Sequence, residues 1–162
     1  MNKIEYTKLF KIVHMNEINI SSDEFPIIGT QGLGPCVAFL VYSEEHKKAV
    51  VAHISANTKD YFQLLFDVIG VYNLQTSPLK YKVFKGYYDN GYKIDEILER
   101  QFQSFPTLFV PFDEIPENAI KVDEESTSHE FAFNALTGEF ITEKVFFGYE
   151  YNQIHEHNNL KK

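Results

Sequence analysis

Cys36, the only cysteine of the chain, stands between a glycine-rich stretch and an apolar run, and His53 follows seventeen residues later in a second apolar stretch. A thiol beside an imidazole is chemically useful because the thiolate is the nucleophile. A neighbouring imidazolium lowers the thiol pKa from its ordinary value of about 8.5. Gly32 and Gly34 allow a tight backbone turn just before the cysteine and leave room for a substrate amide. These residues predict a nucleophilic cysteine with a histidine as its acid–base partner.

The spacing of Cys36 and His53 fits an antiparallel hairpin. Residues 37–42 and 48–55 are rich in apolar side chains, and the polar segment between them has hairpin length. With a four-residue loop over 43–46, Tyr42 pairs with Lys47 and Cys36 falls directly opposite His53. Directly opposite side chains share a face, with Cβ atoms about 4.5–5.5 Å apart. We therefore expect thiol and imidazole in contact, in a register that a one-residue slip would destroy.

Hydrophobic patterning around this hairpin predicts a strand-rich domain with two helices. Aromatic residues make up 15% of the chain, so the core should be aromatic. Strands are expected over 9–13, 17–20, 81–87, 107–110, 119–122, 130–134 and 139–146, and helices over 61–69 and 94–102. A chain of 162 residues fits one domain. We expect this domain to cover residues 1–150, followed by a polar tail over 151–162.

Composition restricts the partners and the compartment. A single cysteine excludes an internal disulfide framework and a cysteine-rich zinc site. The net charge of −8 argues against nucleic acid and anionic membranes as partners. No apolar stretch is as long as a membrane span, and the first residues do not form a signal-peptide pattern. We expect a cytoplasmic protein, although secretion by a route without a cleaved signal would leave no trace in the sequence.

Several patterns resemble ligand sites but favour ordinary structure. The glycines over 29–34 lack the lysine of a phosphate-binding loop and precede a strand, not a helix. The acidic stretch 123–128 lacks ordered spacing of oxygen ligands, and the two histidines of 155–157 lie in a polar tail. Each residue of the cysteine site also has an ordinary alternative. Cys36 fits a buried structural thiol, and His53 fits a core histidine bonded to a carbonyl. Thr30, six residues before the cysteine, fits a turn or cap hydroxyl.

One segment of the chain reads Thr30-Gln31-Gly32-Leu33-Gly34-Pro35-Cys36-Val37-Ala38, and His53 follows seventeen residues after its cysteine. This pattern resembles the chemoreceptor glutamine deamidase family CheD. In that family a Thr-x-Gly-Leu-Gly-Ser-Cys-Val stretch leads into a strand, and a histidine follows at the same spacing. The similarity is close over residues 27–53. The same cysteine–histidine core occurs in secreted bacterial toxins that deamidate host glutamines, including the cytotoxic necrotizing factors. Pro35 replaces the family's serine and removes a hydroxyl and a backbone N–H.

The resemblance implies a fold, a reaction and a set of site residues. The fold is an α+β sandwich of mixed β-sheets with helices packed on the outside. Cys36, His53 and Thr30 would be catalytic, and the loop residues Gly32, Gly34 and Pro35 would surround the oxyanion. The reaction converts a glutamine side chain of a protein substrate, a chemoreceptor or a host protein, into glutamate and ammonia. It passes through a thioester and needs neither metal nor organic cofactor; an amine in place of water would give transamidation.

Two other functions fit the same resemblance. One is a catalytically silent CheD-like binding or regulatory protein, which the change at Pro35 would suit. The other is a secreted effector that deamidates a host protein with the same chemistry. The oligomeric state is left open by the sequence.

Overall fold

Two β-sheets packed face to face carry the candidate site. The computed structural model describes residues 8–58, 60–89, 91 and 93–143. The first sheet, which we call the helix-covered sheet, has the order β2 (Glu17–Ile20), β5 (Lys48–Ile54), β4 (Val37–Ser43), β6 (Leu79–Phe84) and β7 (Phe109–Pro111). The second, the outer sheet, has the order β1 (Phe10–Ile12), β3 (Ile27–Leu33), β9 (Ser128–Asn134) and β10 (Glu139–Phe140), with β8 (Lys121–Asp123) also paired to β9.

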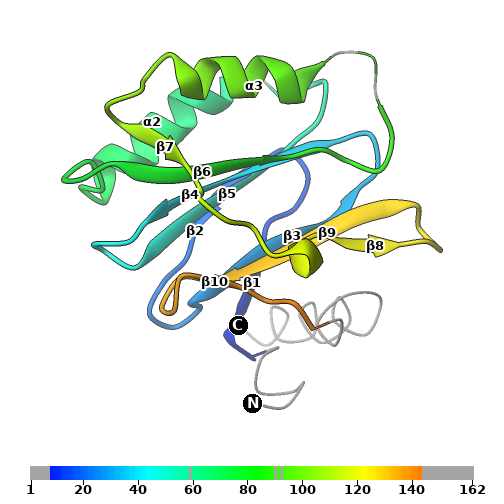
Figure 1. The fold of residues 1–162 in the computed structure, drawn as a ribbon, viewed down its shortest axis with the longest axis horizontal. Helices are drawn as coiled ribbons and strands as arrows, with labels where there is room; N and C mark the ends of the chain where they lie inside the picture. Colours follow the sequence, from blue (N-terminus) through cyan, green and yellow to red (C-terminus); the bar gives the residue numbers. More distant parts are fainter. Residues whose placement is uncertain (1–7, 59, 90, 92, 144–162) are drawn as a thin grey trace.

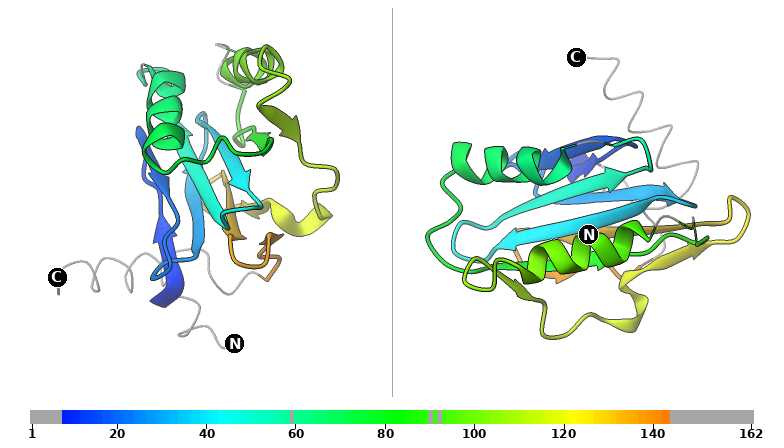
Figure 2. Two further views of the ribbon diagram at one scale, coloured as in Figure 1. Left: turned by 90° about the vertical axis from the view of Figure 1, so that its left-hand side faces the viewer. Right: turned by 90° about the horizontal axis from the view of Figure 1, so that it is seen from above.

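Two α-helices form a third layer on the far side of the helix-covered sheet. Helix α2 (Tyr61–Val71) contacts β2 and β5, and helix α3 (Ile94–Gln103) contacts β6 and β7. The three layers are visible in Figure 1, and the right-hand view of Figure 2 shows from above how the two helices lie over the helix-covered sheet. Strand pairs β1–β3 and β6–β7 are parallel and the other pairs are antiparallel. This architecture confirms the prediction of an α+β fold with mixed sheets and helices packed on the outside.

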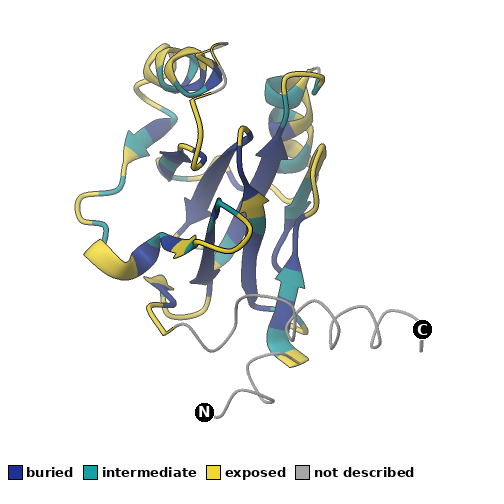
Figure 3. Ribbon diagram, turned by 90° about the vertical axis from the view of Figure 1, so that its right-hand side faces the viewer, coloured by how far each residue is buried: buried dark blue, intermediate teal, exposed yellow. Residues whose placement is uncertain are grey.

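Strands β4 and β5 lie in the middle of the molecule, covered on both faces. Side chains of Phe39 and Val41 pack toward the helices, whereas those of Ala38 and Leu40 pack toward the outer sheet. Every residue of β4 is buried, and Figure 3 shows that the strands in the middle of the molecule are mostly buried. A strand with two apolar environments needs no polar face, which explains the unbroken apolar run in the sequence.

The predicted hairpin register is wrong by two residues. Ser43 pairs with Lys48 and Ala38 pairs with His53, so that Cys36 is not directly opposite His53. The loop covers residues 44–47, because Lys47 takes a left-handed conformation (φ 55°) and the N–H of His46 donates to the Ser43 hydroxyl. A shift of two residues preserves the face of every side chain. Cys36 and His53 therefore still share the face that looks toward the outer sheet.

Other elements differ from prediction mainly at their ends. The helices fall where expected, but the strand expected over 81–87 is β6 and ends at Phe84. The strand over 119–122 begins later, after the short 3-10 helix η1 (Glu117–Ala119). Part of the strand over 139–146 and all of the tail over 151–162 lie outside the described residues. Among the helices that the structure describes, none has the length and apolar character needed to cross a membrane.

Candidate active site

His53 is held between the two sheets near the end of β5. It alternates with Ala52 and Ile54, which face the helices, so its ring points toward the outer sheet. The side chain is only 3% exposed. The carbonyl of His53 accepts the backbone N–H of Asn16 at 2.8 Å, which fixes this end of the strand. The imidazole therefore sits in a dry and rigid environment.

Thr30 fixes the tautomer of this ring. Its hydroxyl, on β3 of the outer sheet, lies 2.6 Å from the carbonyl oxygen of Val13 and 2.8 Å from Nδ1 of His53. A carbonyl can only accept, so the single hydroxyl proton of Thr30 is directed to Val13. The hydroxyl must then accept from His53, and Nδ1 carries the ring proton. Nε2 is consequently the atom with the lone pair in the neutral ring.

Nε2 of His53 is buried and has no hydrogen-bond partner among the described residues. Buried polar atoms are nearly always bonded, so an exception points to a ligand or a reacting group. Burial, and then the nearby charge of His14, lower the pKa of His53 to about 4. At neutral pH the ring is therefore neutral, and Nε2 carries a lone pair and no proton.

Cys36 lies immediately before β4, on the same inner face as Ala38. Because Ala38 is the direct partner of His53, Cys36 is its diagonal neighbour, and such pairs have Cα atoms about 7–8 Å apart. The thiol is 6% exposed, and burial raises its pKa. The expectation of a lowered thiol pKa is therefore not met: burial favours the neutral forms of both Cys36 and His53. No hydrogen bond joins the thiol to Nε2 in this state.

The glycine stretch before Cys36 is mostly strand. Residues 27–33 form β3, and its pairing with β9 is interrupted between Thr30 and Leu33, where Gly32 adopts a left-handed conformation (φ 72°). The N–H of Gly34 donates to the carbonyl of Gly32 at 2.9 Å, and Pro35 has no N–H to offer. Among the residues that the structure describes, no turn or loop hydrogen bond between backbone groups uses the N–H of Cys36. Within this loop, the N–H of Cys36 is thus the group best suited to bind an oxyanion.

A second segment, residues 85–88, holds the Cys36 loop in place. The N–H of Tyr87 donates to the Leu33 carbonyl, and that of Tyr88 to the Gly34 carbonyl, both at 2.9 Å. Between these contacts Gly86 packs so closely that a Cβ atom there would lie 2.3 Å from the carbonyl oxygens of Cys36 and Gly34. Only glycine permits this approach.

We expect Gly86→Ala to destabilise the protein and displace Cys36. Overpacking of this kind costs about 1–3 kcal/mol, to be measured by urea unfolding. The matched control is Gly70→Ala in helix α2, where no atom lies within 4 Å of an added Cβ; this change should stabilise the protein by about 0.5–1 kcal/mol. A Gly86→Ala protein as stable as the wild type would contradict the tight packing of the loop.

His129 lies near the same loop, although its sequence position gave no indication of it. It pairs with Leu33 across β9 and β3, its Nδ1 is 2.9 Å from the Lys85 carbonyl oxygen, and its ring contacts that of Tyr87. His14, next to Val13, also acts on His53 through its charge. Neither histidine belongs to the hairpin whose alternation relates Cys36 to His53. Only the tertiary structure therefore reveals that His14 and His129 lie near the site.

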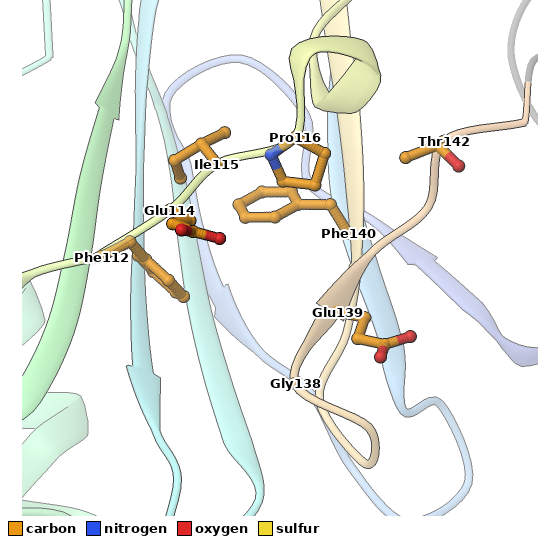
Figure 4. A pocket seen from close by; sticks show the side chains of 8 residues that line it. All are labelled: Phe112, Glu114, Ile115, Pro116, Gly138, Glu139, Phe140 and Thr142. Atoms are coloured by element: carbon orange, nitrogen blue, oxygen red, sulfur yellow. The ribbon is translucent and has the colours of Figure 1, made fainter.

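A separate cleft of about 770 Å³ opens between the residues after β7 and the β9–β10 hairpin, as Figure 4 shows. Phe112, Ile115 and Phe140 line it together with the carboxylates of Glu114 and Glu139. Gly138, also at this cleft, lies beside the hydroxyl of Tyr42 near the end of β4, whereas Cys36 precedes the start of that strand. The cleft is therefore at the opposite end of the sandwich from Cys36.

The described residues contain no group of three or more histidine, cysteine, aspartate or glutamate side chains that could hold a metal ion. The histidines of 155–157 lie outside those residues.

No family model matches this chain, and no curated protein matches it.

Proposed function

We propose that the protein is a cysteine-dependent protein-glutamine deamidase of the kind that the resemblance to CheD implies. The observation that supports it most is the buried bond between Thr30 and His53, at 2.8 Å, which leaves Nε2 unpaired. This basic nitrogen lies on the inner face that also bears Cys36. A structural core histidine would normally have both nitrogens satisfied, so the arrangement favours a proton acceptor.

In the proposed reaction, Sγ of Cys36 attacks the carboxamide carbon of a glutamine side chain while the thiol proton passes to Nε2 of His53. The N–H of Cys36 stabilises the oxyanion; losing such a donor typically costs about 10²–10³ in rate. Collapse of the tetrahedral intermediate breaks the C–N bond, and the proton on Nε2 leaves with ammonia. Water then attacks the thioester carbonyl carbon while its proton passes to Nε2. The C–S bond breaks, the proton on Nε2 returns to Sγ of Cys36, and the product leaves as glutamate after its carboxyl group loses a proton to solvent.

The neutral resting state suits this sequence. A base must be unprotonated before it can accept the thiol proton, and the lowered pKa of His53, about 4, keeps Nε2 unprotonated at neutral pH. Thr30 holds the ring in the one tautomer that offers this lone pair. It acts through His53 and is a positioning residue.

The pH dependence of Cys36 alkylation by iodoacetamide tests this proposal without a substrate. With Nε2 accepting the thiol proton, the wild-type rate should stay nearly constant below neutrality and fall only as His53 becomes protonated, toward pH 4. In His53→Asn the rate should instead fall about tenfold per pH unit below the raised thiol pKa. Asparagine retains an N–H that can donate to Thr30, so the variant removes the base with little change in packing.

Identical pH profiles in the two proteins would exclude His53 as the base. They would favour the second candidate, a catalytically silent binding protein. Two observations support that alternative: the burial-raised pKa of Cys36, and the missing hydrogen bond between its thiol and His53. A secreted effector shares the deamidase chemistry and differs only in its protein substrate.

A further inference from the structure

Cys36 lies at the end of the helix-covered sheet, in a row with residues from three other strands. Glu17 and Ala38 both pair with His53, and Ala38 also pairs with Phe84. Two residues outward along β5, β4 and β6, the next level is made by Ser55, Cys36 and Gly86. Met15 lies at the β2 side of this level, in the turn closed by the bond from the Glu17 N–H to the His14 carbonyl, and its neighbour Asn16 accepts the Ser55 hydroxyl. The bond from the Asn16 N–H to the His53 carbonyl and that from Tyr88 to Gly34 show that the strands stay together there.

This row has exposed apolar side chains on both sides of the nucleophile. Met15 is 56% exposed at the β2 side, and Tyr87 and Tyr88 are 42% and 49% exposed beside β6. Cys36 between them is buried. Single exposed apolar residues are ordinary on a protein surface, but here they stand on both flanks of one reactive group. We call Met15, Tyr87 and Tyr88 the apolar rim.

The tyrosines of the rim are held rigidly. Their backbone N–H groups are bonded to the Cys36 loop, and their rings meet edge to face with centroids 5.1 Å apart. The ring of Tyr87 also contacts His129, with centroids 5.7 Å apart. A preorganised aromatic side chain loses little conformational entropy on binding, which is why tyrosine is frequent in recognition surfaces.

We propose that the apolar rim recognises the protein substrate by contacting apolar side chains on both sides of the target glutamine. This inference rests on the proposed deamidase function and specifies its substrate class. Free glutamine would place its ammonium and carboxylate against Met15 and the tyrosines, and the loss of their hydration would oppose binding. A glutamine within a chain has no such charges, and apolar neighbours would bury additional apolar area.

Protection of Cys36 from iodoacetamide measures this recognition directly. The probes are two blocked peptides, acetyl-Ala-Leu-Gln-Leu-Ala-amide and acetyl-Ala-Asp-Gln-Asp-Ala-amide, together with free glutamine. We expect the leucine peptide to slow alkylation at a concentration about tenfold lower than the aspartate peptide or glutamine requires. The double variant Met15→Ser/Tyr88→Ser should lose this preference. Tyr72→Ser, which alters a tyrosine of equal exposure (50%) just after helix α2, should retain it.

The outcomes separate the two proposals. Equal protection by all three probes, or protection by none, would overturn the recognition role of the rim, as would an unchanged preference in the double variant. Ammonia release from the leucine peptide is followed in parallel. Normal alkylation and selective protection without ammonia release would leave the rim as a recognition surface and reject the deamidase. A thiol that cannot be alkylated in the folded protein would reject both.

Discussion

Replacing Cys36 by serine should reduce ammonia release from a glutamine peptide by at least about 10³-fold, because a hydroxyl in this site remains protonated and is a poor nucleophile. The fold should be retained. Cys36 is 6% exposed, makes no disulfide, and differs from serine by one atom. We therefore expect the free energy of unfolding to change by no more than about 1–2 kcal/mol, as measured by urea denaturation.

The control for this change is Cys36→Ala, which removes the side-chain nucleophile altogether. Both variants should be equally inactive. Activity retained in either would end the assignment of Cys36 as the nucleophile, whatever the behaviour of the apolar rim.

His53→Asn should reduce kcat by about 10²–10⁴-fold, the usual contribution of a positioned acid–base group. The pH dependence of the wild type has a definite sign. Nε2 must be unprotonated to accept the thiol proton, so activity should persist below neutrality and fall as pH drops through the His53 pKa of about 4. Initial rates of ammonia release across this pH range measure both the loss of kcat in His53→Asn and the direction in which wild-type activity changes with pH.

Two variants show whether this effect belongs to His53. Thr30→Val leaves the base in place but removes the hydroxyl that selects its tautomer, so we expect a smaller loss than in His53→Asn. His129→Asn changes the other histidine near the Cys36 loop. It should leave kcat within a few-fold of the wild type, and a loss as large as that of His53→Asn would mean that His129 is the base.

The shared face of Cys36 and His53 was predictable because a strand alternates with a period of two, and a register error of two residues leaves that alternation intact. The register itself was not predictable. It depends on the left-handed Lys47 and on the hydrogen bond to the Ser43 hydroxyl, neither of which the loop's polar composition specifies. Local sequence therefore determines which side chains face each other, whereas turn geometry determines how far apart they are.

A catalytic role for Thr30 was expected only because of the resemblance to CheD, since nothing local indicates a contact twenty-three residues away with His53. The glycines of its segment indicated a loop, but pairing with β1 and β9 makes it a strand with one irregularity. Gly86 had no visible role either. Its requirement for glycine arises from the carbonyl oxygens of Cys36 and Gly34, distant in sequence and adjacent in space.

The bond between Thr30 and His53 also joins the two sheets, and it stands next to an aromatic pair that spans the same gap. Phe131 is the strand neighbour of Thr30, Phe84 that of Ala38, and the two rings are stacked with centroids 3.9 Å apart. The thickness of this stack sets the local separation of the sheets and, with it, the length of the polar bond. Substitutions that change the size of either ring should therefore alter turnover and, because both rings are almost fully buried, lower the free energy of unfolding as well. Enzyme kinetics compared among variants of equal stability would report the spacing of the sandwich.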